Sequence, residues 1–314
     1  MRIGIDAMGG DYAPKAVIDG VLRAQKWITN DIKLVLFGDS ELLVSEFKKQ
    51  KADPEIYEIV HCSEVITMND HPMSGIAQKM DSSITVGFRY LAEGNIDGFA
   101  SAGNTGAMMA GTMTYIKTVP GLTRPAIAAY IPVSETQCNL VLDAGLNSDC
   151  KPEVLVQYGL LGSLYSQYVF GVEKPRVGLL NIGAEAAKGN LLAKSTHELM
   201  ATCSDFCFAG NIEGNELFSN KRADVVVCDG FVGNIVLKEA ESFYAIAKER
   251  GIEDSYLERF NFEYYGGTPV LGVNAPVIIG HGISNGRAID KMIRQTASVI
   301  ASDLCAKFKK AFHV

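Results

Sequence analysis

Short apolar runs alternate with amphipathic stretches along almost the whole chain. Most of these runs are continuous rather than alternating, which is typical of strands covered on both faces. We expect strands at 1–7, 32–37, 56–60, 96–100, 127–133, 139–142, 177–181, 206–209, 225–229 and 277–279. The amphipathic stretches predict helices at 14–29, 83–93, 152–169 and 191–202, and a long last helix at about 283–312. This alternation predicts a doubly wound, mainly parallel α/β sheet.

The segment 234–265 breaks the alternation, because its pattern predicts two helices with no strand between them. Gly251 marks a turn between the two, so we expect a helical hairpin over 235–265 that projects from the sheet. No internal repeat, low-complexity tract or Pro/Gly-rich linker divides the sequence. We therefore expect a single α/β domain over 1–314.

The composition is ordinary for a soluble globule with a sizeable core, since 47% of the 314 residues are hydrophobic and 21% are charged. A formal net charge of −7 disfavours wholesale nucleic-acid binding. No apolar run is long enough to span a membrane. Asp6 and the Gly9-Gly10 turn interrupt the first apolar run, so we expect no signal peptide.

Seven cysteines are scattered through the chain. Several lie in strand-like runs, among them Cys62 and Cys228, which is typical of buried, reduced thiols in a cytosolic protein. Cys203 and Cys207 stand apart from other ligand types, so we expect no metal site.

The first strand runs directly into a glycine turn. Gly9 and Gly10, between Asp6 and Asp11, let the backbone turn sharply and approach a ligand at the strand's end. We expect Asp11 to cap the following helix, with Pro14 in its first turn. The turn lacks the G-x-G-x-x-G pattern, which disfavours a dinucleotide site.

The loop after the 96–100 strand opens a small-residue helix. Its exposed amides and polar side chains suit a phosphate or another anion. The candidates are Ser101, Gly103, Asn104, Thr105 and Gly106. The alternative is a capped tight turn in which Asn104 only holds the start of the helix.

Two later loops also follow strands. In 181–190, Lys188 beside Gly189 and Asn190 can lay its ammonium against a phosphate or a developing oxyanion, although loop lysines are usually just solvated. In 228–234, Asp229 and Gly230 precede Asn234, whose amide can donate to an anion from the first helical turn. The alternative is that Asp229 only caps that helix.

His281 is the one histidine in a strand-end loop, and it can donate to a phosphate or assist a leaving group. Lone histidines are more often structural. Lys151 lies at a helix start, capped by Asp149 or Cys150, where the dipole is unfavourable to a cation unless an anion compensates. No G-x-S-x-G elbow and no Walker A sequence occurs, so covalent acyl-enzyme chemistry and a P-loop are disfavoured. The residues alone predict an α/β enzyme that binds a phosphate-like ligand.

Taken together, these loops resemble the PlsX family of acyl-acyl-carrier-protein:phosphate acyltransferases over nearly the whole chain. The matching motifs are 5–11 with Ala13-Pro14, 101–107, 149–152, 179–183, 188–190, 229–234 and 280–282. The resemblance implies a Rossmann-like fold related to phosphotransacetylases and isocitrate dehydrogenases. It also implies transfer of a fatty acyl group from acyl carrier protein to inorganic phosphate, with no cofactor or metal. The acyl phosphate then serves a glycerol-3-phosphate acyltransferase of phospholipid synthesis.

On this resemblance we expect Lys188 to supply charge for phosphate or oxyanion, Asn234 to donate and position, and His281 to act as a secondary donor or acid. Phosphate or the carrier's pantetheine arm is then expected to bind at the glycine and polar loops. These contain Gly9 and Gly10, residues 101–106, Lys151, Asn190, Asp229 and Gly230. A homodimer is expected in the cytoplasm. Peripheral membrane contact stays an alternative, although the hairpin is shorter than in many relatives and its turn at 248–254 is charged.

The sequence departs from the family at Ala184, Ala186 and Ala187, where glutamate is usual ahead of the lysine, and at Leu146 and Ser148, where smaller or apolar residues are usual. Two other functions stay open at this point. One is an acyl-CoA phosphotransacetylase on the same fold. The other is a non-catalytic scaffold that binds acyl carrier protein.

Overall fold

The computed structural model describes residues 1–312. Its internal contacts group the chain into two compact units. The first comprises Met1–Thr118 with Phe262–Cys305, and the second comprises Val119–Asn261 with the chain from Ala306 onward. Each unit is described by itself below.

The strands of the first unit lie in the order β3-β2-β1-β4-β11-β10. Every pairing among them is parallel except that of β10 with β11. The strands are β1 (Arg2–Asp6), β2 (Lys33–Gly38), β3 (Glu58–His61), β4 (Gly98–Ser101), β10 (Thr268–Leu271) and β11 (Val277–Ile279). The carboxyl ends of β1, β4 and β11 therefore lie side by side.

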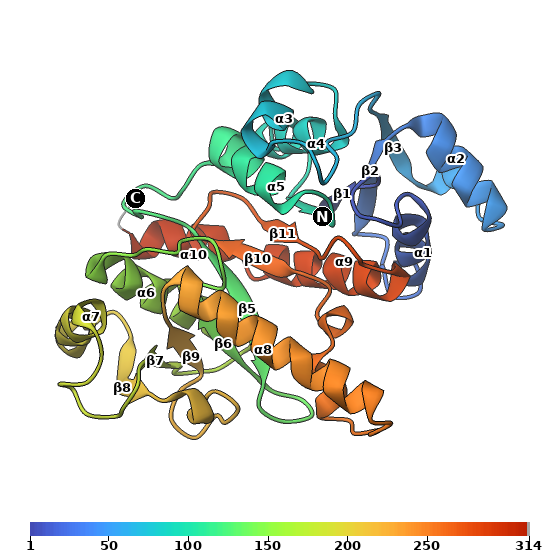
Figure 1. Ribbon diagram of the computed structural model, residues 1–314. Helices are drawn as coiled ribbons and strands as arrows, with labels where there is room; N and C mark the ends of the chain where they lie inside the picture. The colour runs from blue at the N-terminus through green and yellow to red at the C-terminus, as the bar shows by residue number, and fades with distance from the viewer. Residues whose placement is uncertain (313–314) are drawn as a thin grey trace. The chain divides into compact units, whose positions relative to one another are not determined.

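Helices cover both faces of this sheet (Figure 1). They are α1 (Lys15–Ala24), α2 (Ser40–Lys49), α3 (Pro72–Gln78), α4 (Ser83–Ala92), α5 (Thr105–Gly111) and α9 (Gly286–Ala301). Two neighbours in β4 show the layering. A Cβ on Gly98 would meet Ile300 of α9, whereas the Phe99 ring packs on Phe88 of α4 with centroids 5.2 Å apart. α1 packs against α9 on the Gly98 face.

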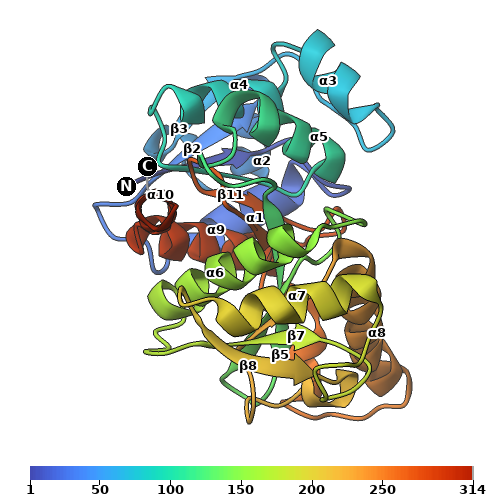
Figure 2. The ribbon, with the colours of Figure 1, turned by 90° about the vertical axis from the view of Figure 1, so that its left-hand side faces the viewer.

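The second unit has the strand order β5-β6-β9-β7-β8, in which only β5 is antiparallel to its neighbour. The strands are β5 (Ala126–Pro132), β6 (Cys138–Leu142), β7 (Arg176–Leu180), β8 (Cys207–Ile212) and β9 (Val225–Val227). α6 (Pro152–Tyr168) and α7 (Leu191–Thr202) cover one face, and α8 (Gly230–Glu249) covers the other (Figure 2).

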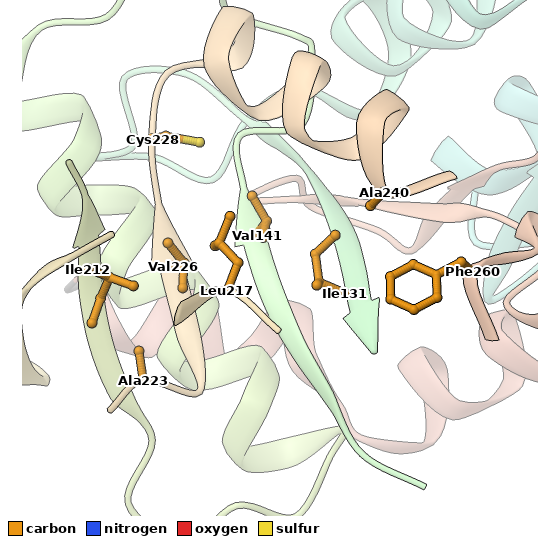
Figure 3. Packing of buried hydrophobic residues seen from close by; sticks show 9 residues of the cluster. All are labelled: Ile131, Val141, Ile212, Leu217, Ala223, Val226, Cys228, Ala240 and Phe260. Atoms are coloured by element: carbon orange, nitrogen blue, oxygen red, sulfur yellow. The ribbon is translucent and has the colours of Figure 1, made fainter. Parts of the chain in front are cut away.

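The core beneath α8 is made by residues of the four strands β5, β6, β8 and β9 (Figure 3). Ile131, Val141 and Val226 point to this face and pack with Ala240 of α8 and with Phe260. Their strand neighbours face α6, because a Cβ on Gly162 of α6 would touch Val225. Burial on both faces explains the continuous apolar runs.

The expected mainly parallel α/β architecture is confirmed, but some elements differ. No expected element corresponds to β10, α2 or α3. The expected single last helix is wrong, because α9 ends at Ala301 and α10 (Leu304–Ala311) follows a break. Asp303 has φ +51°, which is outside helical backbone and separates the two helices.

The hairpin expected over 235–265 has only one α-helical arm, α8. After the Gly251 turn the chain forms two short 3₁₀ turns, Leu257–Phe260 and Phe262–Tyr264, instead of a second α-helix. Arg259 is the physical reason. It is buried, and its guanidinium donates to the backbone carbonyls of Ser134 and Gln137, which ties this segment to the β5–β6 connection.

None of the helices within residues 1–312 is both long and apolar enough to cross a bilayer.

Candidate functional site

In the first unit, the loops after β1 and β4 are joined through a buried carboxylate. Asp6 Oδ2 accepts from Ser101 Oγ (2.6 Å), and Asp6 Oδ1 accepts from the Met8 amide (3.0 Å). Ser101 Oγ in turn accepts from the Gly103 amide (2.9 Å). A Cβ on Gly9 would lie 2.2 Å from Asp6 Oδ2, so only glycine allows this close packing. Gly9, Ser101 and Gly103 therefore lie together, and Asp6 braces the turn.

Burial raises the pKa of Asp6 above its usual value, although the hydrogen bonds from Ser101 and Met8 partly offset this. The folded state then binds a proton at a higher pH than the unfolded state does. The contribution of Asp6 to stability is therefore greatest at acidic pH and falls as pH rises through the raised pKa.

Asp6→Asn should reveal this dependence, because it removes the titrating group. We expect the stability of the unsubstituted protein minus that of the variant to increase between neutral and mildly acidic pH. Urea unfolding of both proteins at the two pH values measures the difference. A constant or decreasing difference on acidification would contradict the raised pKa.

The loop after β11 contacts the first glycine turn. The Asp11 amide donates to the Gly282 carbonyl (2.8 Å), next to Gly10 and His281. The expected Asp11 cap is wrong, because α1 begins at Lys15 and its N-cap is Pro14, without a side-chain cap. Asp11 instead stays with the turn. The His281 ring lies against Phe262, with centroids 4.7 Å apart.

Asn104 caps α5, as the alternative to phosphate binding predicts. Its Oδ1 accepts from the Ala107 amide (3.0 Å), and its Nδ2 donates to the carbonyls of Thr67 (3.0 Å) and Asp70 (3.1 Å). The amide therefore fixes the loop before α3, a structural role that the sequence did not indicate. Thr105 is exposed at the start of α5, and Gly106 is half-buried beside it.

In the second unit, the loop after β6 packs against the start of α8. Buried Asp143 accepts from the amides of Ile127 (3.0 Å) and Asn147 (2.6 Å) and from Asn147 Nδ2 (2.9 Å). The Asn147 carbonyl accepts from the Gly230 amide (2.7 Å). Asp143 is a supporting residue that sequence analysis missed, since one of its partners, Ile127, lies on another strand.

Asp229 and Asn234 flank the first turn of α8. Asp229 caps the helix, with Oδ1 accepting from the Val232 amide (2.9 Å), as the structural alternative predicts. Asn234 is the fifth residue of α8 and so lies in its second turn, not the first as expected. Its exposed amide packs at Gly145, where a Cβ would lie 3.1 Å from Asn234 Oδ1.

The Lys188 loop follows β7, and its backbone is held from several sides. Asn181 Nδ2 donates to the Lys188 carbonyl (3.2 Å), and the Lys188 amide donates to the Glu185 carbonyl (3.0 Å). Asn211, at the end of β8, donates to the same Glu185 carbonyl from Nδ2 (2.8 Å). Lys188 itself is exposed. The loop thus presents a solvated ammonium on a fixed backbone, and Asn181 and Asn211 are supporting residues that the sequence did not reveal.

Asn190 caps α7, its Oδ1 accepting from the Ala193 amide (2.8 Å). Lys151 is itself the N-cap of α6, so the expected cap by Asp149 or Cys150 is wrong. Pro152 explains this, because the residue before a proline is driven to extended backbone, and Lys151 has φ −91° and ψ 156°. Glu153 in the first turn supplies a carboxylate that favours the helix dipole.

A pocket of about 430 Å³ opens at the carboxyl ends of β7 and β9 in this unit. The Lys188 loop, the start of α7 and the start of α8 form its walls. Its lining residues are Leu155, Leu179, Leu180, Asn181, Ile182, Gly189, Asn190, Leu192, Ala193, Gly214, Cys228, Asp229, Val232 and Val236.

No disulfide joins the seven cysteines, all of which lie within residues 1–312; Cys62 and Cys228 are buried and Cys207 is exposed. Burial raises the pKa of Cys62 to about 12 and that of Cys150 to about 11, and it raises the pKa of Cys228 well above its usual value. These three thiols are protonated at neutral pH and are poor nucleophiles. Among residues 1–312, no three His, Cys, Asp or Glu side chains are grouped as metal ligands.

Comparison with known proteins places these loops in a family. A family profile described as fatty acid synthesis protein matches residues 1–307. Among solved structures, a phosphotransacetylase from Streptococcus pyogenes has a TM-score of 0.69 at 16% identity, covering 96% of this chain and 94% of that chain. A branched-chain phosphotransacylase from Enterococcus faecalis V583 has a TM-score of 0.64 at 14% identity, with 96% and 99% covered. At these identities the likeness shows the fold.

Curated relatives are far more similar in sequence. A protein of Caldicellulosiruptor bescii named phosphate acyltransferase is 40% identical over 99% of this chain and 98% of its own length. One of the same name from Desulfitobacterium hafniense is 39% identical over 99% and 97%. The chain therefore belongs to the fatty acid synthesis protein family that contains the phosphate acyltransferases, the PlsX family.

Proposed function

We propose that this chain transfers a fatty acyl group from acyl carrier protein to inorganic phosphate. The products are acyl phosphate and free carrier. The observation that carries the proposal is the fixed loop that exposes Lys188 at the end of β7, in a chain that matches its family from residue 1 to 307. The relatives named phosphate acyltransferase share that full-length match.

The reaction needs no enzyme nucleophile. An oxygen of hydrogen phosphate attacks the thioester carbonyl, and the carbon–oxygen bond forms as a tetrahedral oxyanion develops. The carbon–sulfur bond then breaks, and the leaving thiolate takes the proton that the phosphate brought. The protein must align phosphate with the thioester and stabilise the new negative charge.

Three side chains have proposed roles. The Lys188 ammonium supplies positive charge to the phosphate or the oxyanion. Asn234 donates from its side-chain amide and positions the attacked group. His281 donates a hydrogen bond or a proton as a secondary group. The glycine turns with Gly9, Gly10, Gly103 and Gly230 let the backbone approach a ligand closely.

The remaining assignments follow from the same proposal. In the first unit, Ser101, Thr105 and Gly106 are proposed to bind phosphate or the pantetheine arm, and Lys151 is proposed to do so in the second. Asn104, Asn190 and Asp229 hold the starts of their helices as caps. The donor is acyl carrier protein, and a glycerol-3-phosphate acyltransferase consumes the product. The enzyme acts as a cytoplasmic homodimer with at most peripheral membrane contact, given the charged turn at Lys248, Glu249 and Arg250.

One assay separates this function from its rivals. Purified full-length protein is given acyl carrier protein or CoA thioesters, and thiol release is followed with and without phosphate. We expect phosphate-dependent release that is faster from the carrier than from CoA. Faster release from CoA would favour the alternative that the protein is an acyl-CoA phosphotransacetylase. The shared fold is the observation that supports that alternative. Carrier binding without phosphate-dependent release would leave only a scaffold.

A further inference from the structure

The pocket at the ends of β7 and β9 has a mainly aliphatic lining. Leu155 of α6 and Leu179 of β7 are buried in it, and Val232 and Val236 of α8 also line it. The buried Cys228, on the segment that leads from β9 into α8 (Figure 3), adds a protonated thiol to the lining. A pocket of about 430 Å³ is within the ordinary range for small-molecule sites.

The polar residues of the pocket are already satisfied by the backbone around them. Asn190 Oδ1 accepts from the Ala193 amide, and Asp229 Oδ1 accepts from the Val232 amide. Asn181 accepts from the Ile182 amide (2.8 Å) and donates to the Lys188 carbonyl. These side chains cap helices and close a loop. A polar ligand would have to compete with those contacts, whereas a hydrocarbon would not.

Large exposed apolar side chains also occur at the edge of the pocket or next in sequence to its lining residues. Ile182, at its edge, is 81% exposed, and Leu191, next to Asn190, is 82% exposed. Phe231, next to Val232 in the first turn of α8, is 62% exposed. Apolar surface of this kind around a pocket marks a ligand or partner site.

We infer that this pocket binds the hydrocarbon chain of the fatty acyl group. The inference rests on the proposed function and adds to it a location and a determinant of chain length. Of the reactants, phosphate and the pantetheine arm need hydrogen-bonding partners, and only the acyl chain needs none. The loop that carries Lys188 also forms one wall of the pocket through Gly189 and Asn190. An acyl chain in the pocket therefore has its carboxyl end at this edge.

Filling the pocket should therefore select against long chains. Ala193 lines it near the start of α7, and leucine there keeps helix propensity while adding three carbons to the wall. Each methylene of the acyl chain that is displaced from the pocket lowers the binding affinity about fourfold. We expect Ala193→Leu to lower the ratio of kcat/KM for palmitoyl over butyryl carrier protein by about tenfold or more. Val232→Phe, on the opposite wall, should lower the same ratio.

Ala201→Leu is the matched control, because Ala201 is an exposed residue of the same helix outside the pocket. It should leave the ratio unchanged. If the Ala193→Leu and Val232→Phe proteins are folded and both keep the kcat/KM ratio of the unsubstituted protein, the acyl chain does not bind in this pocket. If the unsubstituted protein shows no phosphate-dependent thiol release with either donor, the proposed function fails instead. Far-ultraviolet circular dichroism confirms that each variant is folded.

Discussion

Replacing Lys188 by alanine is expected to lower the rate of phosphate-dependent thiol release by about 10²-fold or more, which is the usual cost of removing one charge-stabilising donor. The side chain is exposed and its loop is held through backbone carbonyls, so the substitution should leave the fold intact. Steady-state kinetics with acyl carrier protein, varying phosphate, measure the loss.

The two proposed tasks of this lysine predict different losses. If its ammonium binds phosphate in the ground state, KM for phosphate rises. If it stabilises the oxyanion, kcat falls. Lys194→Ala is the control, since Lys194 is also exposed and lies one turn into α7. A Lys188→Ala enzyme with the full rate would remove this residue from the mechanism.

The sequence predicts most of the fold because the strands are covered on both faces. Runs such as 225–229 contain little besides buried apolar residues, so they are recognisable without their neighbours. β10 lacks this signal, because Pro269 interrupts it and Gly266-Gly267 precedes it. The break in the last helix depends on one residue, Asp303, whose positive φ no periodicity reveals.

The site is predictable to the level of its loops, because glycine and polar residues follow the apolar runs. What the loop side chains do depends on partners that are distant in sequence. Asn104 donates to Thr67, and Asn211 donates to Glu185. Local pattern offers Asn104 as a phosphate ligand or a helix cap but does not show its bond to Thr67, and it gives Asn211 no role at all. Hydrogen bonds between residues far apart in sequence are therefore the part of the site that cannot be predicted from a single sequence.

Gly233→Ala is expected to destabilise the protein by about 3 kcal/mol or more, although helix propensity alone predicts a gain of about 1 kcal/mol. Gly233 lies in the first turn of α8, and a Cβ there would be 1.9 Å from the backbone carbonyl oxygen of Asp143. That carbonyl cannot easily retreat, because the Asp143 carboxylate is buried and fixed by the amides of Ile127 and Asn147.

Gly214→Ala separates this clash from the general effect of replacing glycine, because a Cβ at Gly214 meets open space. That variant should match the unsubstituted protein or be slightly more stable, since alanine restricts the unfolded chain. Urea unfolding of the three proteins gives the comparison. The clash also predicts a loss of activity in Gly233→Ala, because moving the start of α8 displaces Asn234. A Gly233→Ala protein as stable as Gly214→Ala would show that the loop after β6 can move away from α8, and that it does not hold Asn234 in place.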